Sequence, residues 1–202
     1  AAFFSILILL RMYYKDYRKR RFVFERKDTA WPWWGLLIPI GILVSLAGNL
    51  LINLTNLTEV SENFEQSQKL LFSGPFVIQI VGIGMIIPIC EELIYRGLIF
   101  MRMRQYCNVN LAIGLSALLF AVFHGNVVQG IYGFATGVLF AYVYEKYGSL
   151  KAPVLVHVSA NLMSLGLSYV NPSFADRGRV FIVGIAAAAV CLLLLWAVDG
   201  HV

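Results

Sequence analysis

The stretch that decides the fold runs from Phe76 to Phe100 and reads FVIQIVGIGMIIPICEELIYRGLIF. It is long enough to cross a bilayer as a helix, since a span needs about 20 mostly apolar residues. It nevertheless contains three charged side chains, those of Glu91, Glu92 and Arg96. Such groups cost about 2.5–3.5 kcal/mol each at the centre of a span and usually mark a functional site. The stretch therefore predicts a membrane-spanning helix that carries chemistry.

The remaining sequence has the composition of a membrane protein. Of the 202 residues, 59% are hydrophobic and only 13% are charged, about half the charged share of soluble domains. The apolar runs are continuous, which favours helices over the alternating strands of a membrane barrel. The other expected spans are 1–10 (the end of a helix whose beginning is missing), 31–54, 111–124, 127–144, 153–170 and 180–198. The prediction is an all-α polytopic bundle of about seven spans, forming one integral membrane domain over residues 1–202.

Basic residues are distributed unevenly between the two sides of this bundle. When the loops are assigned alternately, one side holds 12 Lys and Arg residues and the other holds 3, with Arg96 inside a span. Cytoplasmic loops carry such an excess, so the basic loops are expected in the cytoplasm. The polar segment 55–74 is then expected outside. The short chain and small loops favour a bacterial plasma membrane.

The charge and cysteine content exclude several other classes. The net charge of +5 comes from loops beside apolar runs, and no basic stripe with interleaved aromatics indicates nucleic-acid binding. Cys90, Cys107 and Cys191 lack CxxC spacing, which argues against a zinc knuckle or a disulfide framework. The expected partners are the lipid bilayer and a membrane-associated protein or peptide.

Helical geometry separates the two adjacent carboxylates. Glu92 and Arg96 are four residues apart and lie on one helix face, so they are expected to pair. Glu91 is rotated by about 100° from Glu92 and has no partner on its own helix. It must find one on another helix or hold water. Pro88 removes a helical hydrogen bond close by, which is expected to perturb the helix and admit water.

Two further spans place polar side chains at compatible depths. Phe120 and His124 share one face of the span 111–124, and His157 and Asn161 share one face of 153–170. At ~1.5 Å per residue, Glu91 and Asn161 both lie roughly 15 Å from the basic side. A lone His or Asn in a span is often interhelical glue, but together these residues predict a common cavity. Asn126 and Gln129 follow His124, and their simplest role is to satisfy the helix break.

These residues form three ordered motifs, EExxxR (Glu91, Glu92, Arg96), FxxxH (Phe120, His124) and HxxxN (His157, Asn161). The chain thereby resembles the CAAX-protease and bacteriocin-processing family of membrane proteases, also called the Abi family, which includes the type II CAAX prenyl endopeptidases. The motifs cover residues 91–161, about a third of the chain, within an expected four-helix catalytic core over 76–170.

The resemblance implies peptide-bond hydrolysis within the membrane. It assigns Glu91 as the base that activates water, assisted by His124, and His157 and Asn161 as oxyanion donors. It gives Glu92 and Arg96 a supporting or substrate-gripping role. Phe120 is counted with these supporting or substrate-binding residues, and its simplest role is packing. These residue types suit the chemistry, because a carboxylate in an apolar setting is a competent general base. Imidazole and carboxamide N–H groups can donate to a developing oxyanion.

A metal is the main alternative in the mechanism. Glu91, His124 and His157 could form a His2Glu zinc site with an open position. No HExxH sequence is present, and a Glu91 bound to metal would no longer be the evident base. A mechanism without a cofactor is therefore preferred. Two other functions are a non-proteolytic membrane scaffold and a proton-coupled transporter, since intramembrane Glu and His also occur in carriers.

Overall fold

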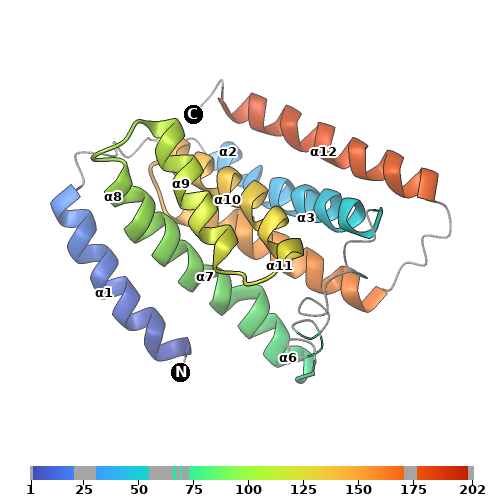
Figure 1. The fold of residues 1–202 in the computed structure, drawn as a ribbon, viewed down its shortest axis with the longest axis horizontal. Helices are drawn as coiled ribbons and strands as arrows, with labels where there is room; N and C mark the ends of the chain where they lie inside the picture. Colours follow the sequence, from blue (N-terminus) through green and yellow to red (C-terminus); the bar gives the residue numbers. More distant parts are fainter. Residues whose placement is uncertain are drawn as a thin grey trace.

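The computed structural model describes residues 2–20, 31–54, 66, 69, 73–170 and 177–199. All regular structure in these residues is helical (Figure 1), which confirms the predicted fold class. The helices, in chain order, are α1 (Ala2–Arg20), α2 (Trp31–Gly35), α3 (Leu37–Leu54), α6 (Phe76–Gln79), η2 (Ile80–Ile86), α7 (Ile87–Glu92), η3 (Leu93–Phe100), α8 (Met101–Met103), α9 (Val109–Val122), α10 (Val127–Tyr147), α11 (Lys151–Val170) and α12 (Arg177–Asp199).

One long helix, Phe76–Met103, contains the charged stretch at its centre. It consists of α6, η2, α7, η3 and α8 without interruption, and η2 and η3 are π-helical. In η2 the backbone bonds join residues five apart, as in the bond from the Ile87 N–H to the Gly82 carbonyl. Pro88 follows this segment and has no N–H to donate. The expected perturbation at Pro88 is therefore a local change of helical register, a feature common at functional sites.

The long helix lies between α1 on one side and α9, α10 and α11 on the other. Helix α3 packs along α11, and α12 packs on α3. Figure 1 accordingly shows α1 and α12 at opposite edges of the bundle. Close approach of α3 to α11 depends on Gly41, because a Cβ there would lie 2.8 Å from the Ser159 Cβ and would collide with the Val156 carbonyl oxygen.

The structure changes several predicted boundaries. The first helix continues to Arg20, well past the expected end at residue 10, through half of the basic cluster. Two contacts hold this extension: Tyr13 packs against Gly97, and Arg102 donates to Asp16 at 2.5 Å. The predicted fourth span ends at Val122, so His124 lies in the following turn and not on the helix. Most of the expected 55–74 loop and the turn at 171–176 fall outside the described residues.

Three described helical stretches are long and apolar enough to cross a membrane: Trp33–Leu50, Phe76–Met103 and Val127–Tyr147. Val109–Val122 and Ile182–Ala197 are apolar but shorter. Helix α11 has 20 residues, and its polar side chains, including His157 and Asn161, reduce its apolar character.

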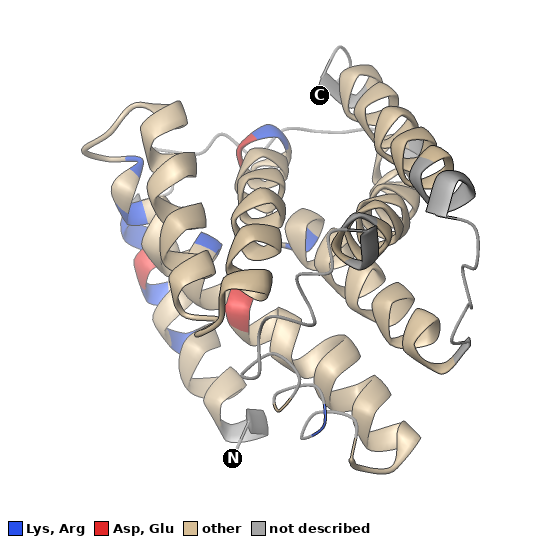
Figure 2. Cartoon of the chain, turned by 45° about the vertical axis from the view of Figure 1, so that its right-hand side comes forward, with Lys and Arg blue, Asp and Glu red and all other residues tan. Residues whose placement is uncertain are grey.

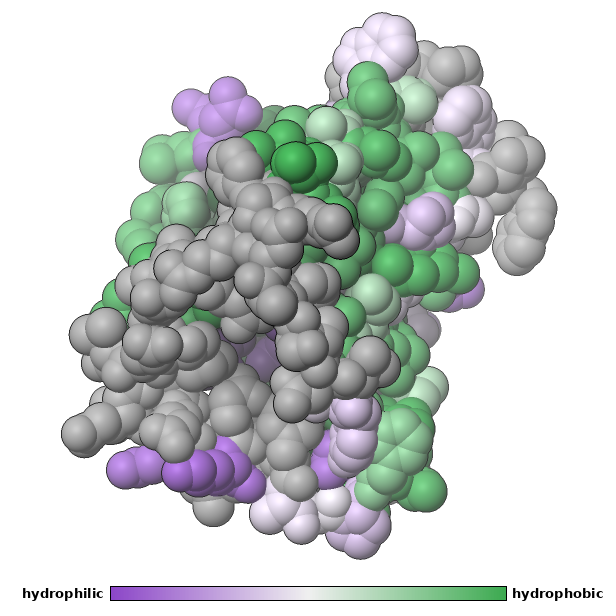
Figure 3. Space-filling model, turned by 90° about the vertical axis from the view of Figure 1, so that its right-hand side faces the viewer, coloured by the Kyte–Doolittle hydropathy of each residue, from purple (hydrophilic) through white to green (hydrophobic). Residues whose placement is uncertain are grey.

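The outer surface suits a lipid environment. Large apolar side chains point outward on several helices, with Trp196 77%, Val77 70% and Val122 66% exposed. A contiguous apolar surface of this kind is unusual on a soluble protein. Figure 3 shows apolar side chains over much of the visible described surface, and Figure 2 shows Lys and Arg gathered beside α1 and the end of the long helix. The chain is an integral membrane protein.

Candidate active site

The buried ion pair of Glu92 and Arg96 lies beneath the candidate site. Arg96 Nη1 donates to Glu92 Oε1 at 2.9 Å, and both side chains are fully buried. The predicted i,i+4 pairing is thereby confirmed. The Arg96 guanidinium also lies between two aromatic rings, 4.7 Å from the Phe120 centroid and 5.1 Å from that of Phe140. Desolvated cation–π contacts stabilise a buried cation by about 2 kcal/mol or more.

Helix α10 supplies a hydrogen-bond acceptor for this guanidinium. Arg96 Nη2 donates to the Gly137 carbonyl at 3.0 Å. Gly137 also allows α9 and α10 to lie close together, since a Cβ at this position would lie 3.1 Å from Ala117 and 3.2 Å from the Phe120 ring. The glycine thus contributes both the space and the carbonyl that hold Arg96.

His157 connects the buried pair to the second carboxylate. Its Nδ1 lies 2.8 Å from Glu92 Oε1, and its ring stacks on Phe140 with centroids 4.4 Å apart. Because the acceptor is a carboxylate paired with Arg96, Nδ1 carries the hydrogen and donates it. The other nitrogen, Nε2, lies 3.6 Å from Glu91 Oε2. Glu92 thereby fixes the ring and directs Nε2 toward Glu91.

Glu91 is the more accessible of the two carboxylates. Its side chain is 26% exposed, whereas that of Glu92 is fully buried. Glu91 has its ion-pair contact with His157 on α11 and none on its own helix in the described part of the chain. Of the two outcomes expected from the sequence, a partner on another helix or a bound water, the structure shows the first.

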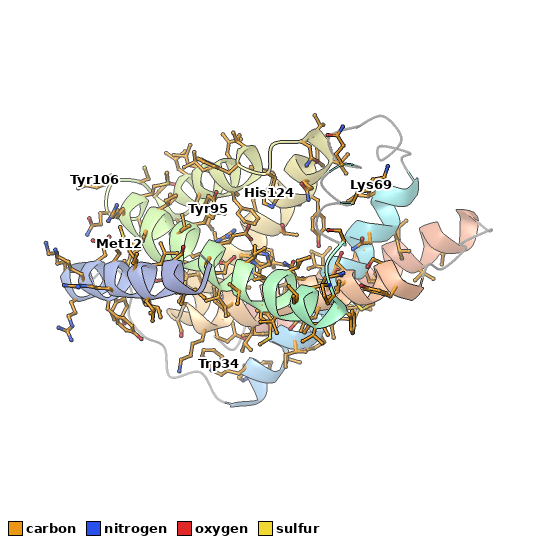
Figure 4. All side chains as sticks on the ribbon, turned by 90° about the horizontal axis from the view of Figure 1, so that it is seen from below. Met12, Trp34, Lys69, Tyr95, Tyr106 and His124 are labelled. Atoms are coloured by element: carbon orange, nitrogen blue, oxygen red, sulfur yellow. The ribbon has the colours of Figure 1, made fainter. Side chains whose placement is uncertain are left out.

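His124 reaches the site from the turn after α9. Its Nδ1 lies 2.7 Å from the Phe120 carbonyl oxygen, so Nδ1 donates and Nε2 can accept a proton. The rings of Phe120 and His124 meet edge to face at 4.7 Å, and the two residues remain adjacent although His124 has left the helix. Figure 4 shows His124 and Tyr95 in the middle of the bundle, between Tyr106 at one end and Lys69 at the other.

Asn161 contacts the π-helical segment. Its Nδ2 donates to the Ile83 carbonyl at 3.0 Å. Continuing the five-residue register of η2 would require residue 88 as the donor to this carbonyl, and Pro88 has no N–H. The carboxamide of Asn161 replaces the missing donor. One N–H of Asn161 is thus used by the backbone, and its second N–H remains for another acceptor.

A cavity of about 320 Å³ brings these groups together. Glu91, Phe120, His124, His157 and Asn161 all line it, so the three motifs meet at one place. Glu92 and Arg96 lie behind the wall, with no exposed surface. Such a volume is at the lower end of the range of small-ligand pockets and can hold a short peptide segment.

The cavity is also lined by polar residues to which the sequence assigned no role in a site. They are Asn49 from α3, Gln129, Tyr132 and Thr136 from α10, and Ser164 from α11. Asn49 Nδ2 donates to the Ser45 carbonyl at 2.9 Å and approaches Ser164 Oγ at 3.3 Å. The sequence signal that could have identified these residues was their position as isolated polar side chains within apolar runs. Helix α3, which lies outside the three motifs, therefore contributes to the cavity wall.

The three side chains considered for zinc do not form a metal site in this arrangement. Among the described residues, no group of three His, Cys, Asp or Glu side chains is placed to hold a metal ion. Both nitrogens of His157 face carboxylates, Nδ1 toward Glu92 and Nε2 toward Glu91. The geometry thus presents Glu91 and His157 to each other.

The two carboxylates differ in what their removal should do. Glu92→Gln leaves Arg96 buried without its counter-charge, and breaking a buried pair costs about 3–5 kcal/mol. We expect this variant to lose thermal stability in detergent as well as activity. Glu91→Gln should retain the stability of the unmodified protein, because Glu91 is partly exposed and makes no pair with Arg96. Equal melting temperatures for the two variants would contradict the assignment of Glu92 as the structural carboxylate.

Comparison with known proteins agrees with the geometry. The family model described as "Type II CAAX prenyl endopeptidase Rce1-like" matches residues 73–163, which include all three motifs. A curated relative, "Putative membrane peptidase YdiL" of Bacillus subtilis (strain 168), is 25% identical over 116 residues, 57% of this chain and 47% of the relative. The chain thus spans about half the length of this relative. No solved structure matches the chain. Over residues 73–163 the chain is thus similar to the Rce1-like type II CAAX prenyl endopeptidases, as the three motifs led us to expect.

Proposed function

We propose that the protein is an intramembrane endopeptidase that hydrolyses a peptide bond of a membrane-associated protein or peptide. The observation that carries the proposal is the position of Glu91. It is a carboxylate in a cavity inside the bundle, 3.6 Å from His157 Nε2 and sharing the cavity with His124. A carboxylate and imidazoles that line one cavity are groups able to activate a water molecule for hydrolysis by general acid–base catalysis.

In the proposed reaction a water molecule lies between Glu91 and His124 Nε2. Glu91 takes its proton as the oxygen attacks the carbonyl carbon of the scissile bond, and a tetrahedral intermediate forms. The C–N bond then breaks, and the proton held by Glu91 passes to the leaving amine nitrogen. The products are a carboxylic acid and an amine, which leave as carboxylate and ammonium once the acid proton passes to the amine, and Glu91 returns to its ionised state. His124 orients the water, because its Nδ1–H is already fixed by the Phe120 carbonyl.

His157 and Asn161 are proposed to stabilise the oxyanion. Since His157 Nδ1–H donates to Glu92, Nε2 can donate only when the ring is an imidazolium. A carboxylate lies near each nitrogen of this ring, Glu92 at Nδ1 and Glu91 at Nε2, and would offset the charge of an imidazolium. Asn161 would supply its second N–H. Preorganised donors of this type are worth about 2.7–4 kcal/mol each in transition-state stabilisation.

Glu92 and Arg96 support this site and do not grip the substrate in the proposed mechanism. Both side chains are fully buried behind the cavity wall. Phe120 packs against the guanidinium and the ring of His124, which agrees with a packing role. The catalytic core over 76–170 remains part of the proposal, with α3 added as a contributor to the cavity.

A comparison of membrane peptides tests the proposed activity. We expect membranes containing the active protein to accumulate cleavage products that are absent with Glu91→Gln, which should fold but lack the base. The products would be identified by mass spectrometry, with equal protein levels verified in both membranes. Identical peptide sets would instead favour a non-proteolytic scaffold, and proton-coupled uptake by liposomes containing the protein would favour a transporter.

The orientation proposed from the basic residues places the α8–α9 loop on the cytoplasmic side of a bacterial plasma membrane. Tyr106 in this loop is 85% exposed, and Lys69 in the opposite segment is exposed as well. In a background with Cys90, Cys107 and Cys191 replaced by Ala, Lys69→Cys should react with a membrane-impermeant thiol reagent in intact cells. Tyr106→Cys should react only after the cells are opened. The reverse labelling would invert the proposed topology.

A further inference from the structure

We propose that Gln129 is a substrate-positioning residue whose side-chain Nε2 donates a hydrogen bond to a main-chain carbonyl of the bound peptide. This inference rests on the proposed function, since it presupposes a peptide in the cavity. Gln129 is half-buried near the start of α10 and lines the same cavity as Glu91. It lies outside the three sequence motifs, and its simplest role from sequence was to complete the helix break after His124.

The hydrogen bonds of Asn126 determine which end of the Gln129 carboxamide faces the cavity. Asn126 Oδ1 accepts from the Gln129 backbone N–H at 2.9 Å as the cap of α10. The other end of the Asn126 side chain must therefore be its NH₂ group, which donates to the His124 carbonyl and to the Gln129 side chain. Only the oxygen of Gln129 can accept this hydrogen bond. Its NH₂ group is consequently directed away from Asn126, and in the described residues no protein group accepts from it.

The face of α10 places this NH₂ group along the path of a peptide. Gln129, Gly133 and Phe140 lie on one cavity-facing side of the helix. Phe140 stacks on His157, and a Cβ at Gly133 would lie 3.4 Å from His124 Nδ1. Gln129 lies four residues before Gly133, or ~6 Å away along the helix axis. Since an extended chain rises about 3.3 Å per residue, Gln129 Nε2 is placed for a carbonyl about two residues from the scissile bond.

The turn before α10 maintains this arrangement. Gly125 has φ of +73°, a left-handed conformation that favours glycine, and it lets the chain reverse between His124 and Asn126. Asn126 is thereby bonded to the carbonyl of His124 and to both the backbone and the side chain of Gln129. One cap residue therefore positions a proposed water-orienting group and a proposed substrate donor together.

A purely structural role is the alternative, because Asn126-x-x-Gln129 also has the spacing of a capping box. The two roles respond differently to Gln129→Glu. Glutamate is equally suited to the third position of a helix, so capping would be retained. The cavity would instead receive a carboxylate oxygen, which cannot donate to a carbonyl. Gln129→Met removes the donor without adding charge, which controls for an electrostatic effect on Glu91.

Asn126→Asp tests the orientation itself. Aspartate still caps the helix through one oxygen, but its second oxygen accepts a hydrogen bond where Asn126 donates. The Gln129 carboxamide should then flip and present its oxygen to the cavity. The matched control is Asn108→Asp, because Asn108 caps α9 in the same manner, accepting from the Leu111 N–H at 2.9 Å, and is exposed outside the cavity.

The experiment measures KM, kcat and melting temperature for these variants, with an internally quenched peptide built on a cleavage site from the membrane peptide comparison. Gln129→Glu, Gln129→Met and Asn126→Asp should each raise KM about tenfold, the effect of one lost hydrogen bond. The kcat of Gln129→Glu and Gln129→Met should stay within about twofold, since the contact is made equally before and during the reaction. Asn126→Asp should lower kcat as well, because it also loses the hydrogen bond to the His124 carbonyl. Asn108→Asp should behave as the unmodified protein, and Asn126→Asp combined with Gln129→Met should raise KM no further than either change alone.

Two results would overturn the inference. If Gln129→Glu keeps the KM and melting temperature of the unmodified protein, Gln129 serves only as a helix cap. If KM changes only in variants that also melt earlier, the effect is structural. Failure of the proposed function gives a different outcome, namely no Glu91-dependent cleavage site from which to build the peptide.

Discussion

The site depends on an ionised pair held where water does not solvate it. Glu92 and Arg96 are fully buried on one helix within the bundle, and such groups are stable there only when their hydrogen bonds are provided by neighbouring elements. The Gly137 carbonyl, His157 and the rings of Phe120 and Phe140 fulfil this need. The same contacts determine where α9, α10 and α11 lie relative to the long helix. The polar core therefore positions the helices as well as the catalytic groups.

The two adjacent carboxylates have different roles because of this arrangement. Glu92 is used by Arg96 and His157 and has no exposed surface, whereas Glu91, rotated on the helix, reaches the cavity. The π-helical backbone and Pro88 add a second link, because they free the Ile83 carbonyl for Asn161. Each proposed catalytic side chain is thus anchored by one group, leaving a second group for the reaction. Preorganisation of this kind is the basis of electrostatic stabilisation in enzymes.

Much of this architecture could be predicted from the sequence, because its signals are local. Apolar runs predicted the helices, and i,i+4 spacing predicted the Glu92–Arg96 pair. Other features depend on tertiary contacts. The first helix extends through Arg20 because Asp16 meets Arg102 and Tyr13 fits against Gly97, contacts that no local pattern indicates. His124 leaves its helix, since α9 ends at Val122 and the chain turns at Gly125. Asn49 and Ser164 were not identified because a single polar residue in a span is usually interhelical glue, and Gln129 was assigned only to the helix break.

Glu91 is proposed to act as a base on water and not as a metal ligand. The most direct measurement is the rate of peptide cleavage by purified protein whose metal content has been reduced far below one ion per chain and verified by elemental analysis. We expect cleavage to continue at the rate of the untreated protein, and added zinc not to increase it. Loss of cleavage on metal removal, restored by one equivalent of zinc, would contradict the account and assign Glu91, His124 and His157 to a metal site.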